Sequence, residues 1–314
     1  MKLYKYMSMS TFNSFAKSHS LRLTKSYSQN DPFEFKLSQN DLEKFLLSPE
    51  KQHEFEEFVN MSGCISMSGD KSNIYMWSHY SDNHRGVMAE FTFDENDPKS
   101  LFFGNANVWQ GSHIENPTGF YYGHINYKKT RPFHNFNGDL NRVIETLYFC
   151  KSEDWDKEFE YRFIIPFTEV TEILLTRKGM NEISEIPVAG RLIEEIPGKD
   201  DNEIYRFKVT GLSISYLLGT GQCDVLHKIW RHEGPDCLFL LKMDIGKLSG
   251  LYFGCKSSTD DYFRENDVSD SDYFNGKFYS FFNEKINGFY QAYPDENEFR
   301  INFKPAEIIE NTKS

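Results

Sequence analysis

The chain has 314 residues, and its 35 Lys and Arg against 47 Asp and Glu give a formal net charge of −12. This balance excludes a general polyanion-binding surface, so any nucleic-acid site has to be local. Aromatic residues are abundant (29 Phe, 18 Tyr and 4 Trp), which favours strands and short helices and excludes a coiled coil or helical repeat. No apolar run approaches the roughly 20 residues that span a bilayer.

The N-terminal segment and the cysteines both indicate a reducing compartment. The chain begins MKLYKYMSMS, without the apolar region of a secretory signal, so we expect a cytoplasmic protein that does not associate with a membrane. The five cysteines form no CxxC pair and leave one unpaired in any disulfide framework. We expect them to be reduced and assign them no role.

In chain order, the first third alternates strands with short helices. Hydrophobic spacing predicts strands at residues 3–6, 21–24, 63–67 and 86–93, and helices at residues 10–18 and 74–80. Residues 26–34 form a turn-rich connection, in which Pro32 keeps the preceding residue out of the helical region. Asn40 and Glu43 resemble a capping box that opens a helix with a break at Pro49.

The rest of the chain is less regular. Residues 94–119 lack periodicity and predict a long irregular insertion, and residues 169–199 are Glu-rich and interrupted by proline. We expect strands at residues 121–127 and 158–167, a helix at 139–151, two strand-glycine-helix units at 213–230 and 251–264, and a closing hairpin at 288–303. We interpret residues 1–314 as a single α+β domain with insertions near 94–119 and 169–250.

The strongest local motif is the charge alternation at residues 158–162. A strand there would place Glu158, Glu160 and Arg162 on one face, with aromatic residues on the other. An exposed sheet face with an ion pair is the commoner origin of such a pattern. Inside a cavity, the same face would hold one acid ionised and orient the other, which suits ribose hydroxyls or a developing cation.

A second motif, residues 73–86, concentrates aromatic and hydrogen-bonding side chains. Trp77, His79 and Tyr80 are suited to stacking a flat ring, although an aromatic cap on the core would have the same composition. His79 and His84 are five residues apart, which does not place two ligands on one helical face. We therefore predict no metal site.

Three weaker motifs remain. Residues 28–34 carry more polar groups than a turn requires, and Gly219-Thr-Gly221 follows a predicted strand but lacks the full glycine pattern of a dinucleotide site. Residues 127–134 interleave basic and aromatic side chains, which suits nucleic acid, although a solvated loop is the commoner outcome.

Several motifs together resemble a bacterial family, the domain-of-unknown-function family two-nine-seven-one. They are LYKY at 3–6, NDPFE at 30–34, CIS at 64–66, MWSHY at 76–80, NHRG at 83–86, EFEYR at 158–162 after Lys151 and Trp155, and LYFG at 251–254. The family has no settled activity, and many members occur among bacterial defence and toxin-like genes. The resemblance implies a toxin-antitoxin or antiphage defence role, with an antitoxin or chaperone as partner.

The chain is also similar, more weakly, to ADP-ribosyltransferases of the diphtheria-toxin and nucleic-acid-modifying kinds. That similarity implies a split, mostly antiparallel sheet with flanking helices, NAD as the substrate, and a nucleic-acid or protein acceptor. It also implies Glu160 with Glu158 as the catalytic residues, and Lys5 or Tyr6 and Ser66 with Tyr80 as NAD-binding residues. From the two local motifs we add Arg162 to the catalytic residues, and Trp77 and His79 to the NAD-binding residues. The first-strand Arg or His of those enzymes is absent, and Lys5 stands nearest to it.

Our leading hypothesis is therefore an ADP-ribosyltransferase-like effector whose pocket lies between the first strand, residues 76–86 and residues 158–162. One alternative is a metal-dependent nuclease, with its ion held by charged side chains, namely Asp31, Glu34, Lys151, Glu158 and Glu160. Another is a non-catalytic module in which residues 75–80 bind a nucleotide or peptide.

Overall fold

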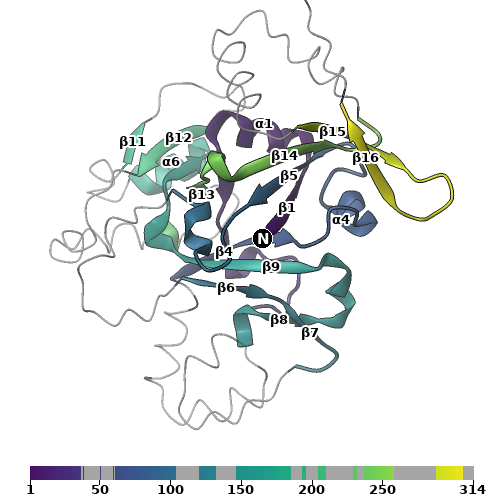
Figure 1. Cartoon of the computed structure of the whole chain (residues 1–314). Helices are drawn as coiled ribbons and strands as arrows, with labels where there is room; N and C mark the ends of the chain where they lie inside the picture. The colour runs from purple at the N-terminus through teal and green to yellow at the C-terminus, as the bar shows by residue number, and fades with distance from the viewer. Residues whose placement is uncertain are drawn as a thin grey trace, which may run out of the picture.

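A computed structural model of the chain (Figure 1) describes residues 1–36, 38, 50, 59, 61–103, 120–131, 146–184, 193–195, 204–209, 229–231, 237–257 and 288–306. Within these residues the protein is α+β and mostly β, with one large sheet, two smaller sheets and a few short helices. The expectation of a mostly antiparallel α+β fold is confirmed at this level.

The large sheet runs across the centre of the molecule. Its strands are β1 (Lys2–Met7), β3 (Thr24–Lys25), β4 (Ser62–Ser68), β5 (Val87–Thr92), β6 (Tyr121–His124), β9 (Glu160–Pro166), β14 (Leu248–Phe253), β15 (Phe289–Pro294) and β16 (Ile301–Pro305). The order is β16-β15-β14-β5-β1-β4-β9-β6, with β3 paired onto β4. Every pairing is antiparallel except β14 with β15.

Two smaller sheets accompany it. The five-stranded sheet contains β2 (Ser20–Arg22), β10 (Glu172–Leu175), β11 (Ile193–Glu195), β12 (Tyr205–Val209) and β13 (Cys237–Lys242), in the order β11-β12-β10-β13-β2. The third sheet pairs β7 (Asn126–Lys128) with β8 (Cys150–Ser152) in parallel. Four of the five strands of the second sheet come from the segment expected as an insertion, 169–250, and the fifth, β2, comes from the N-terminal part of the chain.

The described helices are short, and their starts follow from capping side chains. They are α1 (Met9–Ser18), α4 (Ile74–His79) and α6 (Arg177–Ser184), with 3₁₀ segments that include η4 (Glu153–Glu158). The Ser8 side chain accepts from Thr11 N at 3.2 Å, and Asn73 Oδ1 accepts from Met76 N at 3.1 Å. Of the helices in the described ranges, none combines the length and the hydrophobicity needed to cross a bilayer.

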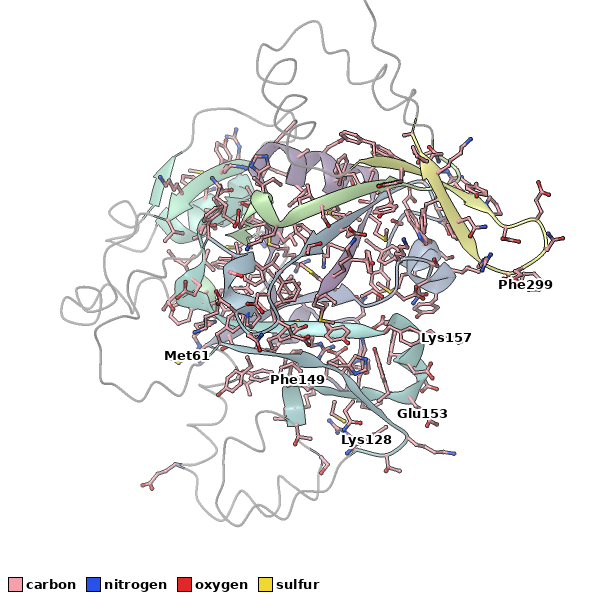
Figure 2. The ribbon with its side chains drawn as sticks, in the orientation of Figure 1. Met61, Lys128, Phe149, Glu153, Lys157 and Phe299 are labelled. Atoms are coloured by element: carbon pink, nitrogen blue, oxygen red, sulfur yellow. The ribbon has the colours of Figure 1, made fainter. Side chains whose placement is uncertain are left out.

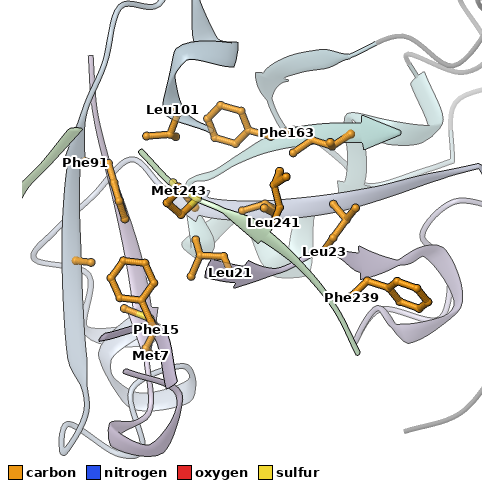
Figure 3. Close-up of a cluster of buried hydrophobic side chains, with 14 of the residues drawn as sticks. Met7, Phe15, Leu21, Leu23, Phe91, Leu101, Phe163, Phe239, Leu241 and Met243 are labelled. Atoms are coloured by element: carbon orange, nitrogen blue, oxygen red, sulfur yellow. The ribbon is translucent and has the colours of Figure 1, made fainter. Parts of the chain in front are cut away.

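One face of the large sheet packs against the second sheet and α1, as Figure 3 shows for part of this core. Leu21 and Leu241 come from the second sheet, Phe15 from α1, and Phe91 and Phe163 from the large sheet. Because successive side chains of a strand point to opposite faces, the polar side chains of β4 and β9 are directed away from this core. That opposite face carries Glu160 and Arg162, two of the candidate site residues.

The structure corrects three element boundaries. The strand expected at 121–127 divides into β6 and β7 at Ile125, and the helix expected at 139–151 ends before β8. The strand expected from residue 158 begins at Glu160, because η4 precedes it and Phe159 adopts a left-handed backbone with φ of 47°. Most of the helix expected after Asn40, and most of residues 104–119, 213–230 and 258–264, lie outside the described residues.

All described cysteines are free thiols, in agreement with the sequence analysis. Cys64 and Cys237 are buried, and Cys150 and Cys255 are half-buried. Cys223 lies outside the described residues.

Two glycines allow close backbone contact behind α4. A Cβ at Gly86 would lie 2.0 Å from Met7 O, and a Cβ at Gly254 would lie 2.1 Å from His84 O.

We expect Gly86→Ala to lower the free energy of unfolding by about 1–3 kcal/mol or more, since backbone atoms must move. Gly246→Ala is the matched control, because its Cβ would meet only the Asp244 side chain, at 3.1 Å. Urea denaturation measures both, and equal stability of the two variants would contradict the prediction.

Candidate active site

Five charged side chains are buried together on the face of the large sheet that is directed away from the main core. Three are acids (Glu34, Glu158 and Glu160) and two are cations (Lys151 and Arg162). Their exposed fractions run from 0 % for Arg162 to 7 % for Lys151. Charges this deeply buried are stable only when they are paired, so the contacts among them define the site.

Lys151, from β8, joins all three acids. Its Nζ lies 2.6 Å from Glu158 Oε2, 3.1 Å from Glu34 Oε1 and 3.3 Å from Glu160 Oε2. The Trp155 ring covers the ammonium, with its centroid 4.7 Å away.

Arg162, from β9, holds two of the acids behind Lys151. Its Nε donates to Glu160 Oε1 at 2.6 Å and its Nη2 to Glu160 Oε2 at 3.1 Å. Nη2 also donates to Glu34 Oε2, and Nη1 donates to Tyr148 O at 3.1 Å. This two-bond contact fixes the orientation of the Glu160 carboxylate.

Small residues on both neighbouring strands make room for the guanidinium. In the registers of β9, Arg162 lies opposite Ser66 of β4 and Gly123 of β6. The Ser66 side chain also contributes to lowering the pKa of Glu160, and its Oγ lies 3.3 Å from Cys64 Sγ.

Glu158 reaches the cluster although it is not in the strand. It ends η4, and the left-handed Phe159 then turns the chain into β9. Ser68 Oγ donates to Glu158 O at 2.8 Å, and Gly69 N donates to Phe159 O at 2.8 Å. From α4, the Tyr80 hydroxyl donates to Glu158 Oε1. The strand expected from Glu158 therefore starts two residues later, at Glu160, yet both acids and Arg162 converge.

The two catalytic candidates have opposite pKa shifts. Burial alone would raise the pKa of Glu160, but Arg162 and Lys151 outweigh it and lower that pKa to about 2. Burial raises the pKa of Glu158, and the charge of Glu160 adds to the effect, against the opposing influence of Lys151. One carboxylate is therefore held ionised beside a second that retains its proton more readily.

The cations remain charged. Burial lowers the pKa of Lys151, but the negative charges of Glu160, Glu34 and Glu158 raise it above its ordinary value. With three acids and two cations, the cluster carries one net negative charge when all its members are ionised.

A cavity of about 210 Å³ opens beside the cluster. Its walls come from β1, β4, α4 and the 28–34 connection, and Lys151, Glu158 and Glu160 complete them. Lys5 Nζ donates to Ser66 O at 2.8 Å, and burial lowers the pKa of this lysine. The Tyr6 hydroxyl donates to Asp70 O at 2.6 Å.

Most of the sequence-predicted site residues line this cavity. They are Lys5, Tyr6, Ser66, Tyr80, Glu158 and Glu160. Arg162 is fully buried and reaches the cavity only through the acids that it holds.

Two predicted members lie elsewhere, which corrects the expectation of a shared tryptophan-histidine-tyrosine wall. Trp77 is fully buried, donates from Nε1 to Lys71 O at 3.0 Å and meets the Tyr6 ring edge-on at 5.2 Å. His79 is exposed and lies 4.3 Å from the Tyr75 ring. The helical period of α4 explains the separation, because it directs Met76 and Tyr80 to the cavity and turns the other side chains away.

Glu34 and Lys151 were missing from the leading hypothesis and appeared only in the nuclease alternative. Glu34 belongs to the NDPFE motif, whose excess of polar groups was the one pointer to it in the sequence. Lys151 was expected at the end of a helix, and its position in β8 brings it to the acids.

The donor set does not fit a metal centre. In the part of the chain that the structure describes, no three His, Cys, Asp or Glu side chains are arranged to hold a metal ion. The three acids of the cluster are instead bonded to Lys151 and Arg162. Asp31, which the nuclease alternative also used, accepts from Phe33 N at 2.9 Å.

Comparisons with known proteins add no family: no protein-family model matches the chain, and no match was found among the curated proteins or the solved structures.

Removing Arg162 should destabilise the fold strongly. Arg162→Met leaves Glu34 and Glu160 buried without their main cation, which costs about 3–5 kcal/mol in the free energy of unfolding. Arg300→Met is the control, because Arg300 pairs with Asp295 at 3.2 Å with its side chain 55 % exposed, and its loss should cost about 1 kcal/mol or less. Equal losses in urea denaturation would rule out the energetic role of the cluster.

The stability of the protein should depend on the ionisation of Glu160. Its pKa falls from an ordinary 4.5 to about 2 on folding, so the carboxylate stabilises the fold above the ordinary value and this contribution is lost as the pH falls toward 2. The gap in unfolding free energy between the wild type and Glu160→Gln should therefore narrow from about pH 6 to about pH 3. A gap that stays constant over this range would show that Glu160 does not titrate in this way.

Proposed function

We propose that the protein transfers ADP-ribose from NAD to a macromolecule, as a bacterial toxin or antiphage effector, in the cavity beside Glu158 and Glu160. The observation that carries the proposal is the pair of neighbouring carboxyl groups with opposite pKa shifts. Such a pair separates the roles of charge stabiliser and proton acceptor in glycosyl-transfer chemistry.

Each acid has a distinct task in this reaction. As the bond between ribose C1′ and the nicotinamide nitrogen breaks, its electron pair passes to the nicotinamide ring and positive charge develops on the ribose. Glu160, ionised and oriented by Arg162, stabilises this charge and accepts a hydrogen bond from the ribose 2′-hydroxyl. The acceptor nucleophile forms the new bond to C1′ and gives its proton to Glu158, whose raised pKa makes it the better base.

The other walls suit the remainder of NAD. Tyr4, Tyr6 and Tyr80 supply aromatic surface for the nicotinamide ring. Lys5 and Arg22 supply positive charge for the diphosphate. Under the proposed similarity to ADP-ribosyltransferases, Lys5 would take the place of their first-strand Arg or His.

The geometry of the sheet supports the same assignment. β1 and β4 share the single register pair Tyr4–Ser68, and Lys5 and Ser66, on these two strands, both line the cavity. Such limited pairing of the first strand with its neighbour is consistent with the split sheet that the similarity to ADP-ribosyltransferases implies.

A non-catalytic nucleotide-binding module is the second candidate. Both oxygens of Glu160 are already engaged, Oε1 by Arg162 and Oε2 by Arg162 and Lys151. In a non-catalytic module, the carboxylates orient a bound nucleotide, and the nucleotide is not converted to product.

Incubation with labelled NAD and separate pools of RNA, DNA and protein tests the proposal. We expect NAD consumption or labelling, and a loss on the order of 10²–10³ in rate for Glu160→Gln. This variant should remain folded, because it leaves two acids against two cations. Glu153→Gln, at an exposed position of η4, is the matched control and should keep its activity.

Three outcomes would overturn the assignment. Activity that survives Glu160→Gln removes the role of that carboxylate. NAD binding without consumption, measured by calorimetry, indicates the binding module. Cleavage of nucleic acid that needs a divalent cation and no NAD indicates the nuclease.

A further inference from the structure

A second cavity, of about 240 Å³, adjoins the proposed NAD site. It is bounded by the 31–36 connection, by β7 with the residues that follow it, and by β8. Glu34 and Lys151 line both cavities, so this ion pair forms part of the partition between them. The proposed function leaves the second cavity unexplained.

The mouth of this cavity is basic, in contrast to the chain as a whole. Lys36, Lys128, Lys129 and Arg131 line it and are exposed, although the net charge of the chain is −12. Lys128 ends β7, and Figure 2 shows it at the lower edge of the coloured ribbon. A local group of cations on an acidic protein attracts phosphate groups to this one place.

The acids that line the cavity do not neutralise this group. Glu34 is bonded to Lys151 and Arg162, and Asp31 is 3 % exposed and accepts from the Phe33 amide. Among the described residues, no ion pair joins either acid to the exposed cations.

An exposed aromatic ring stands among the cations. Phe33 is 62 % exposed, and the Arg131 guanidinium carbon lies 5.7 Å from its ring centroid. Arg131 Nη2 also donates to Phe33 O at 3.0 Å, which fixes the cation beside the ring. An exposed ring flanked by a guanidinium is a platform on which a nucleobase can stack.

The turn that carries Phe33 also positions Glu34. The Asp31 side chain accepts from Phe33 N at 2.9 Å, and Glu34 N donates to Asp31 O at 3.3 Å. Phe35 then adopts a left-handed backbone with φ of 57°. As a result, Phe33 is exposed at the basic cavity while Glu34, the next residue, is buried in the ionic cluster.

We propose that this second cavity binds single-stranded nucleic acid, with phosphates on Lys128 and Lys129 and one base on Phe33. The cations would also attract an acidic peptide, but such a peptide has no base to stack on the exposed ring. A cavity of about 240 Å³ is too small to admit a duplex. This inference rests on the proposed function and extends it. The single-stranded nucleic acid is the acceptor of ADP-ribose, and it is bound next to the Glu34–Lys151 ion pair that separates the two cavities.

Fluorescence anisotropy with labelled oligonucleotides of about 12 nucleotides, without NAD, tests the binding. The probes are single-stranded RNA, single-stranded DNA, a duplex of the same sequence and poly-glutamate, over a series of salt concentrations. We expect both single strands to bind more tightly than the duplex and the peptide.

Two variants separate the phosphate-binding and base-stacking roles. Lys128→Gln with Lys129→Gln should reduce the slope of log affinity against log salt by about 0.7 for each phosphate that the protein no longer neutralises. Phe33→Ala should weaken binding about 10-fold with little change in that slope. The matched controls are Lys242→Gln with Lys304→Gln, and Phe299→Ala at the β15–β16 turn, which lies far from Lys128 in Figure 2. All the substituted side chains are exposed, so the variants should fold, and circular dichroism checks this.

The outcomes are decisive for the inference and separate it from the proposed function. Tighter binding of poly-glutamate, equal binding of the duplex, or equal effects of the control variants would overturn it. Single-strand binding by a protein that never consumes NAD would support the binding site and refute the transferase. NAD consumption without single-strand binding would support the transferase and refute the nucleic-acid site.

Discussion

The pairing of the buried Arg162 side chain with Glu160 and Glu34 is the interaction on which the rest of the site depends. Removing these charges from water is expensive, and the cost is offset only if each group meets a partner of opposite charge in good geometry. Lys151 extends the same network to Glu158. Segments far apart in the chain are therefore held together by one requirement, that no charge in the cluster is left alone. The hydrophobic core on the other face supplies stability, and the cluster supplies the specific arrangement.

The unequal environments of the two neighbouring acids follow from this network. Glu160 receives two bonds from the Arg162 guanidinium and a longer one from the Lys151 ammonium, whereas Glu158 receives one from that ammonium and one from a tyrosine hydroxyl. Because three acids share two cations, the carboxyl groups are not all stabilised equally in their charged form, and their pKa values differ. A difference between two adjacent carboxyl groups is what a reaction needs when one must remain charged and the other must take a proton.

Much of the fold and part of the site follow from the sequence. Residues 63–67 and 86–93 were predicted to be strands, and the structure contains both, as β4 and β5. The convergence of Glu158, Glu160 and Arg162 was predicted from the period of two of a strand, although Glu158 arrives from a 3₁₀ turn. Glu34, which is 128 residues from Arg162, could not be placed, because its contact is created by tertiary packing.

Trp77 was predicted to line the site, but the structure places it in the core. Composition alone does not say which face of a six-residue helix meets a cavity, and here the largest side chain fills the core while Tyr80 meets the acids. Tryptophan offers more apolar surface to bury than any other residue, so burial in the core stabilises the fold more than a position in the wall of the cavity would.

The partition formed by Glu34 and Lys151 has a thermodynamic consequence. Glu34 and Lys151 line both cavities, so a ligand in either one can contact the same ion pair. If a ligand in one cavity changes the bonds of Lys151 to the acids, it also changes the affinity for a ligand in the other. Thermodynamic linkage makes such a heterotropic effect equal in both directions.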